Sequence, residues 1–408
     1  MGADRMMYRR TLLAMALAMG AMWSTARVAA STEFAACISN LQKRARAEGV
    51  AEDVVKRLGQ VEQRQRILDL DRRQPEAAET FAEYLRRRVT DTKIEEARAF
   101  ASEHKRLLER VSRRYGVPAP YLLAFWGIES HFGRHVGDIP VLDSITTLAC
   151  DERRAASFSR QLMAALHILD RRLVLPERFT GSWAGAMGNF QFMPTVFLRY
   201  GVDFDGDGLR NLWDFPDALA SAGNFLRGLG WKPGIRWGRE VTLPEGFPVH
   251  LADGKTARPL RRWRRLGVRE ANGRRLPASS LKAALLLPSG HRGPAFVVYR
   301  NYHAIMRWNQ SSFFALAVGH LADRIEGGRP LHRPPPDDEP RLSRQAVQTL
   351  QERLHERGFD CGEPDGVSGS ATRDAIRAFQ RKHGLVADGY PGPEVIEALG
   401  GLDGQRGG

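Results

Sequence analysis

The stretch YLLAFWGIESHFG, residues 121–133, places one carboxylate, Glu129, among apolar, aromatic and glycine residues. On a helix, the residues three, four and seven positions away would share its face, and these are Leu122, Phe125, Trp126 and Phe132. An ionised carboxylate in such surroundings is costly without a partner, and burial raises its pKa because burial disfavours the charged form.

A carboxylic acid that stays protonated near neutral pH is what cleavage of a glycosidic bond requires, since the leaving sugar oxygen must receive a proton. Glu129 is therefore a candidate general acid. The segment alone leaves open two other accounts, a helix-end glutamate that faces solvent and a core glutamate satisfied by hydrogen bonds.

The length and composition of the chain limit the number of domains and the kind of protein that it can be. A chain of 408 residues is too long for one core of ordinary size, which predicts two domains with a linker or tail. A hydrophobic fraction of 43% and a charged fraction of 26% are typical of a soluble globular protein. The formal net charge of +14 comes without a nucleic-acid motif, so an anionic polymer outside the cytoplasm is the expected partner, with a merely basic protein as the alternative.

The N-terminus has the pattern of an export signal over residues 1–30. Arginines at 5, 9 and 10 precede an apolar stretch at 12–23, and small residues follow. This predicts a periplasmic protein, with an uncleaved membrane anchor as the alternative; a lipoprotein signal at Cys37 fits poorly. In an oxidising compartment the three cysteines allow one bridge, and Cys37 with Cys150 is the expected pair, leaving Cys361 free.

The rest of the chain divides by pattern into a mainly α fold with a small β-containing part. Helical spacing dominates residues 32–230, short strands are expected between 237 and 298, and helix resumes at 311–325. We expect a catalytic domain at 31–327, a proline-rich linker at 328–341 and a small three-helix domain at 342–400.

Three motifs carry a resemblance to a known family. GIESHFG is similar to the Glu-Ser-x-x-Gly motif of lytic murein transglycosylases. GSWAGAMGNFQFMPTVF, residues 181–197, and NYHAIMRWNQSSFFALAV, residues 301–318, resemble the second and third motifs of the membrane-bound lytic transglycosylase B family, which has a lysozyme-like catalytic domain. The motifs occur in the family's order. The C-terminal residues resemble the peptidoglycan-binding domain type 1 through PDGVSG, AIRAFQ and the Asp-Gly at 388.

The resemblance implies cleavage of the β-1,4 bond between N-acetylmuramic acid and N-acetylglucosamine with formation of a 1,6-anhydro product. Glu129 would act first as acid and then as base, because the muramoyl C6 hydroxyl supplies the nucleophile. An ordinary glycosidase needs a second carboxylate, and Asp143 or Asp151 could serve as one. A muramidase-type hydrolase and a non-catalytic wall-binding scaffold are therefore the alternatives.

The resemblance also implies a set of substrate-binding residues across the motifs. Two departures concern Phe225 and Phe314, which stand where well-known family members have tyrosine, so a hydroxyl contact is lost there. The full expected set is Ser130, Arg153, Arg154, Ser182, Met187, Gln191, Asn309 and Phe314.

The loop DFDGDGLRNLWDFPD, residues 203–217, resembles an EF-hand calcium loop, with aspartates at positions one, three and five and glycine at six. Position twelve is Asp214, which could equally be a helix N-cap, and the family places the closing carboxylate at Asp217. The expected ligands of a structural Ca²⁺ are Asp203, Asp205, Asp207, the Leu209 carbonyl and Asp217; an unmetallated turn is the alternative.

No cofactor is expected in the chemistry. Peptidoglycan glycan strands are the expected partner of a monomer, with cell-wall synthesis proteins as further candidates and nucleic acid excluded.

Overall fold

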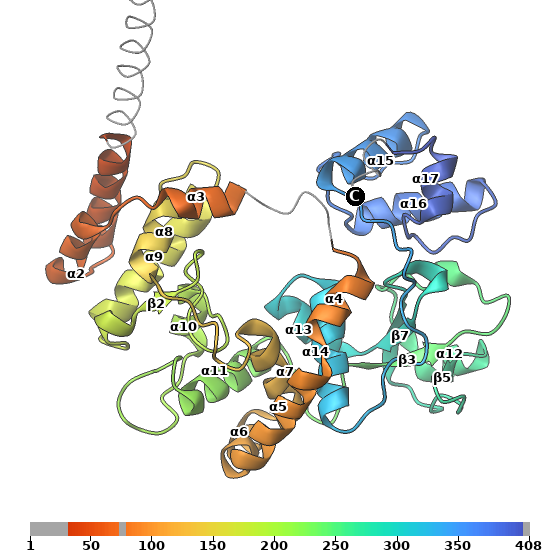
Figure 1. Ribbon diagram of the computed structural model, residues 1–408, viewed down its shortest axis with the longest axis horizontal. Helices are drawn as coiled ribbons and strands as arrows, with labels where there is room; N and C mark the ends of the chain where they lie inside the picture. The colour runs from red at the N-terminus through yellow and green to blue at the C-terminus, as the bar shows by residue number, and fades with distance from the viewer. Residues whose placement is uncertain (1–31, 73–78, 403–408) are drawn as a thin grey trace, which may run out of the picture. The chain divides into compact units, whose positions relative to one another are not determined.

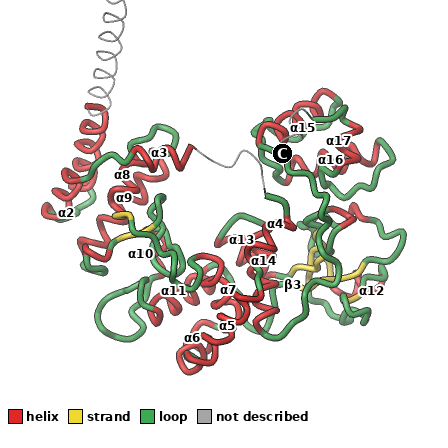
Figure 2. Tube along the Cα trace, in the orientation of Figure 1, coloured by secondary structure: helices red, strands yellow, loops and turns green. Residues whose placement is uncertain are grey.

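The computed structural model describes residues 32–72 and 79–402 (Figure 1), so the predicted signal sequence at 1–30 lies outside the described residues. The structure is mostly helical with a small sheet (Figure 2), which confirms the predicted fold class. None of the helices in the described ranges combines the length and apolar character needed to cross a membrane. The described residues form two compact units: one of 32–72, 136–199 and 206–211, the other of 79–135, 200–205 and 212–402.

The first unit is built on the packing of α8 against α9. Ile145 and Leu148 of α8 and Leu162 and Leu166 of α9 are fully buried at the core of this unit. A disulfide joins Cys37 to Cys150 at the end of α8, which confirms the predicted pairing. The elements of the unit are a helix at 32–47, α2 (Glu52–Arg57), η1 (Leu58–Gln60), α3 (Gln65–Arg72), β1 (Ile139–Pro140), α8 (Val141–Ala149), α9 (Ala155–Asp170), η2 (Pro176–Arg178), β2 (Thr180–Gly181) and α10 (Pro194–Tyr200).

The second unit has a helical part centred on α7. Every α7 residue from Tyr121 to Ile128 is buried, as expected for a helix that is apolar on all sides. Other helices surround α7, since it contacts α14, α5, α6 and α11. The helices of this part are α4 (Phe81–Arg88), α5 (Asp91–Glu103), α6 (Lys105–Tyr115), α7 (Ala119–Glu129), α11 (Phe215–Gly228), α13 (Arg300–Trp308) and α14 (Ser312–Ile325).

A five-stranded antiparallel sheet in the order β4-β6-β7-β3-β5 follows in the same unit and confirms the strands predicted between 237 and 298. Its own core includes Trp263, Leu285 and Val297, each fully buried. The elements are β3 (Gly238–Thr242), η3 (Val249–Leu251), β4 (Arg258–Pro259), α12 (Leu260–Arg265), β5 (Arg269–Glu270), β6 (Lys282–Leu286), η4 (Gly290–Arg292) and β7 (Ala295–Val298).

The C-terminal helices α15 (Arg344–Glu356), α16 (Ser370–Lys382) and α17 (Pro393–Ala398) enclose a separate small core. Gln351 of α15 and Gln380 of α16 are buried and play the same part. Each side-chain amide donates to the aspartate of an Asp-Gly pair, 365–366 or 388–389, at 3.1 and 2.8 Å. Each amide oxygen accepts from the glycine N–H of the same pair, at 2.9 and 2.8 Å. Residues 328–341, which precede this domain, form neither helix nor strand.

Candidate active site

The end of α7 sets the position of Glu129. The helix stops at this residue, Ser130 follows at the C-cap, and the next three residues take positive φ: 53° at His131, 57° at Phe132 and 82° at Gly133. The Ser130 hydroxyl is buried and accepts a hydrogen bond from the Gly133 N–H at 3.0 Å, which stabilises the turn. Glu129 is therefore the last helical residue before a tightly held turn.

One expectation for this segment is wrong. Phe132 does not continue the helical face of Glu129, because the left-handed turn begins before it. Its ring instead folds back onto α7 and packs against Trp126 with centroids 5.3 Å apart. Gly127 makes this approach possible, since a Cβ there would lie 2.7 Å from the Phe132 ring.

The half-buried Glu129 side chain accepts a hydrogen bond from a residue 179 positions further along the chain. The Trp308 indole Nε1–H donates to its Oε1 at 2.8 Å. Burial raises the pKa of Glu129 to about 7, although the Trp308 hydrogen bond and the positive charge of Arg88 both act to lower it. Arg88 also donates to the Ile128 carbonyl at 3.3 Å, which places its charge beside the end of α7. The arrangement provides a carboxyl group that can both give and take a proton near neutral pH.

Aromatic rings fix the Trp308 indole that holds the carboxylate. The rings of Phe125 and Phe225 lie 4.4 and 4.7 Å from it. The Phe314 ring packs against the Phe125 ring with centroids 5.8 Å apart and is 3% exposed. This predicted substrate residue is therefore buried behind the rings of Phe125 and Trp308. Asn309, by contrast, is exposed at the C-cap of α13, directly after Trp308.

The second motif forms a compact loop in the first unit that brings Ser182, Met187 and Gln191 together. The Ser182 hydroxyl accepts from the Ala186 N–H at 3.1 Å, and the Gln191 side chain donates to the Gly188 carbonyl at 2.9 Å. Gln191 itself adopts a positive φ of 49°. Met187 is 1% exposed and supports the loop from inside.

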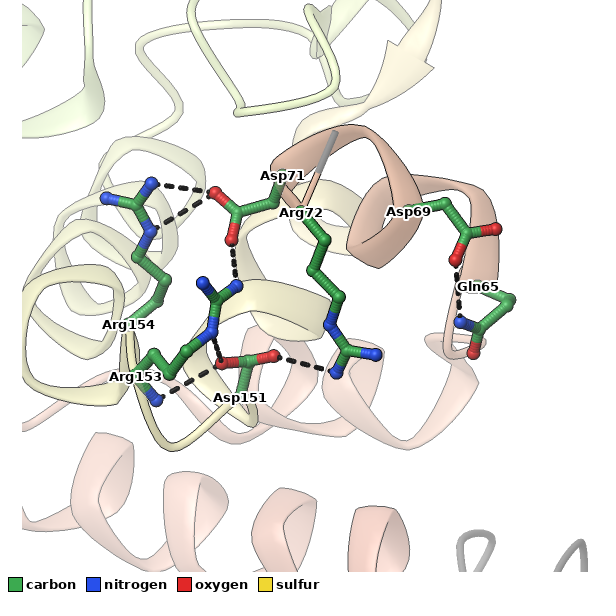
Figure 3. A network of polar contacts seen from close by, with 7 residues as sticks. All are labelled: Gln65, Asp69, Asp71, Arg72, Asp151, Arg153 and Arg154. Atoms are coloured by element: carbon green, nitrogen blue, oxygen red, sulfur yellow. Dashed lines mark hydrogen bonds and ion pairs between the residues drawn. The ribbon is translucent and has the colours of Figure 1, made fainter. Parts of the chain in front are cut away.

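Arg153 and Arg154 lie at the start of α9 and share one buried carboxylate (Figure 3). Asp71, 1% exposed, accepts from Arg153 at 2.5 Å and from Arg154 at 2.8 Å. The Arg153 guanidinium also pairs with Asp151 at 3.5 Å, so Arg72, Arg153 and Arg154 face two acids, which leaves an excess positive charge. The Arg153 side chain remains 56% exposed. Guanidinium groups carry five donors each, so the pair keeps donors for an external carboxylate while Asp71 orients it.

The two aspartates considered as a second catalytic carboxylate are each held by arginine. Asp143 pairs with Arg64 at 2.6 Å. Asp151, 7% exposed, accepts from Arg72 at 3.4 Å, and its other oxygen accepts from the Arg153 backbone N–H at 3.1 Å. Within the unit that contains Glu129, the charged group that shifts its pKa is the cation Arg88.

The aspartate loop brings three of its predicted ligands together. Single carboxylate oxygens of Asp203, Asp205 and Asp217 lie within 4.8 Å of one another, and Asp217 is 1% exposed. Three carboxylates that converge with one of them buried fit a hard divalent cation. The Asp207 carboxylate accepts from the Leu209 N–H at 2.8 Å and is not in this group. Asp214 occupies the N-cap position of α11, as its alternative interpretation expected.

Comparison with known families assigns the chain. The model of the transglycosylase SLT domain matches residues 33–323, a span that contains Glu129 and all three motifs. The chain belongs to this family. A putative peptidoglycan binding domain matches residues 343–399, which include both Gln351 and Gln380. The resemblance inferred from the motifs is thereby confirmed.

Relatives within the family are named as lytic murein transglycosylases. The chain is 31% identical over 248 residues to membrane-bound lytic murein transglycosylase B of Escherichia coli (strain K12), and this match covers 59% of the chain and 66% of that relative's length. SltB3 from Pseudomonas aeruginosa, solved in complex with NAG-anhNAM-pentapeptide, is 43% identical with a TM-score of 0.86 over 90% of this chain and 99% of that one. Slt35 from Escherichia coli, solved in complex with calcium, is 28% identical with a TM-score of 0.59 over 71% and 92%.

Sequence reasoning missed three residues that contact the candidate residues: Trp308 and Arg88 at the end of α7, and Asp71 beside Arg153 and Arg154. Trp308 lies inside the quoted third motif, next to Asn309, so its position was a usable signal. Arg88 and Asp71 lie in unremarkable helical stretches and become visible only through their contacts.

Proposed function

We propose that the protein is a lytic transglycosylase that cleaves the β-1,4 bond between N-acetylmuramic acid and N-acetylglucosamine and leaves 1,6-anhydromuramic ends. The observation that carries this proposal is a single carboxyl group, Glu129, whose pKa is raised to about 7 and which Trp308 holds at 2.8 Å. A relative's crystal complex with an anhydro-muramoyl peptide supports the same product class.

In the first step, protonated Glu129 donates its proton to the glycosidic oxygen as the bond from that oxygen to the muramoyl C1 breaks. The N-acetylglucosamine leaves with the proton on its new hydroxyl. The Trp308 N–H, already directed at Oε1, stabilises the carboxylate that forms in this step.

In the second step, the carboxylate removes the proton from the muramoyl C6 hydroxyl, and that oxygen bonds to C1. The 1,6-anhydro ring closes, Glu129 is protonated again, and no water is consumed. A hydrolase would need a second carboxylate to activate water, and the ion pairs of Asp143 and Asp151 argue against that use.

The other parts of the chain have supporting roles in this proposal. Ser182, Gln191 and Asn309 would contact sugar, and the Arg153–Arg154 pair would meet a carboxylate of the substrate. Calcium held by Asp203, Asp205 and Asp217 would brace the fold without entering the chemistry. The export signal would deliver the protein to the periplasm, and residues 342–400 would raise its effective concentration on the wall.

The test is digestion of purified sacculi followed by mass spectrometry of the products. We expect anhydromuramic ends from the parent protein and no cleavage from Glu129→Gln, which keeps the shape of the side chain but carries no transferable acid proton. Reducing ends would point to a hydrolase instead. Equal cleavage by the variant would remove Glu129 from its role.

A further inference from the structure

A cavity of about 540 Å³ lies beside the small sheet, outside the catalytic residues described above. Helix α12 forms one wall and the hairpin that begins with β5 forms another, where Arg269 and Arg275 face each other across an antiparallel bridge. On α12, residues 261, 264 and 265 share a face because they are three and four positions apart. The lining consists of Arg261, Arg264, Arg265, Gly267, Val268, Arg269, Arg275 and Ala278.

The positive charge of the chain is concentrated around this cavity. Residues 258–282 carry eight arginines, one lysine and one glutamate, a formal charge of +8 out of +14 for all 408 residues. The glutamate, Glu270, does not line the cavity and is already engaged by Arg239 and, at 3.0 Å, by Arg274. Five guanidinium groups therefore line one hollow without an acidic residue among the lining side chains.

Two of these arginines are held in place by backbone. Arg264 donates to the Leu276 carbonyl at 3.3 Å, and Arg269 donates to the Gly273 carbonyl at 3.2 Å. Each contact uses one N–H and leaves other donors of the same guanidinium unused by it. Arg261, Arg265 and Arg275 are exposed, and none of the three forms an ion pair within the described part of the chain.

We propose that this cavity binds a multiply charged, phosphate-bearing anion. Like charges around one hollow repel one another, and a ligand with several negative charges in a small volume offsets that repulsion. A lone carboxylate brings one charge, whereas linked phosphates or a phosphomonoester bring more, and guanidinium groups match phosphate oxygens in bidentate geometry. The volume falls in the usual range for small-ligand sites and exceeds that of a single inorganic phosphate.

The experiment measures binding of inorganic tripolyphosphate to the full chain by calorimetry at low salt, and sedimentation with vesicles of phosphatidylcholine with and without phosphatidic acid. The cavity variant is Arg261→Gln, Arg265→Gln and Arg275→Gln together. The control variant removes the same charge through Arg106→Gln, Arg262→Gln and Arg381→Gln, exposed arginines that do not line the cavity. An unchanged melting temperature verifies that both variants are folded.

We expect the cavity variant to weaken binding at least about tenfold, because each lost arginine removes a charge-assisted hydrogen bond, while the control changes it less than about threefold. If the loss appears with tripolyphosphate, the site takes a soluble anion; if it appears only with phosphatidic acid vesicles, the site takes a lipid headgroup. Binding of neither probe, or equal losses in the two variants, would overturn the proposal.

Discussion

Replacement of Glu129 by glutamine should stabilise the protein, and the gain should grow with pH. Burial raises the pKa of Glu129 from its ordinary value of 4.5 to about 7, so the folded protein binds this proton more tightly than the unfolded chain does. The stability that the proton contributes is fully present below pH 4.5 and is lost as the pH rises through 7. Glutamine has no such proton to lose and can still accept the Trp308 hydrogen bond.

The difference between the two pKa values corresponds to ~3 kcal/mol of unfolding free energy at most. We therefore expect the stability of Glu129→Gln relative to the parent to increase by roughly 2–3 kcal/mol between pH 5 and pH 9. The assay is urea unfolding of both proteins across this range, followed by circular dichroism. Glu95→Gln, which removes an exposed carboxylate of α5, controls for the change in net charge. A stability difference that stays constant with pH would refute the reasoning, because it would mean that burial does not hold the Glu129 proton.

Three further changes test other parts of the structure. Trp308→Phe keeps the ring packing but removes the N–H that lowers the pKa of Glu129, so the alkaline limb of the pH profile of kcat/KM should move up by about one pH unit, and an unmoved limb would contradict the hydrogen bond's role. Chelation with EDTA should lower the melting temperature and leave turnover largely intact; no change in melting when calcium is added back would remove the metal site. Deletion of residues 342–408 should weaken retention on sacculi more than turnover of short glycans, and equal retention would argue against a wall-binding role.

Local patterns carried much of the prediction. The apolar run around Glu129 marked both a buried helix and a perturbed carboxylate, since both depend on neighbours within a few residues. The strands between 237 and 298 followed from spacing in the same way. The pairing of Cys37 with Cys150, 113 residues apart, was predictable for another reason, since an export signal and only three cysteines leave few possible partners. The buried helix is predictable from an apolar run, the strands from a short apolar period, and the disulfide from the small number of cysteines.

Other contacts between distant segments could not be predicted from the sequence. Trp308 is 179 residues from Glu129, and no local pattern says which indole will reach the carboxylate. The end of α7 at Glu129 depends on the Ser130 cap and a left-handed turn that includes two non-glycine residues, which propensity disfavours. The predicted continuous catalytic region at 31–327 likewise passes back and forth between two compact units, because packing joins segments that the sequence separates.

Gln351 and Gln380 form the same pair of hydrogen bonds, each with its own Asp-Gly turn. This repetition gives the C-terminal domain the character of an internal duplication. Each helix carries an apolar residue and a glutamine, then a glycine with positive φ, and then an Asp-Gly pair that folds back onto the glutamine. The copies have diverged in use: Asp388 also accepts the His291 N–H at 2.8 Å from the sheet region, whereas the loop of Asp365 ends in Val367, whose side chain is 55% exposed. One repeat thus contacts the sheet region of the same chain, whereas the other presents an exposed apolar side chain at the corresponding loop.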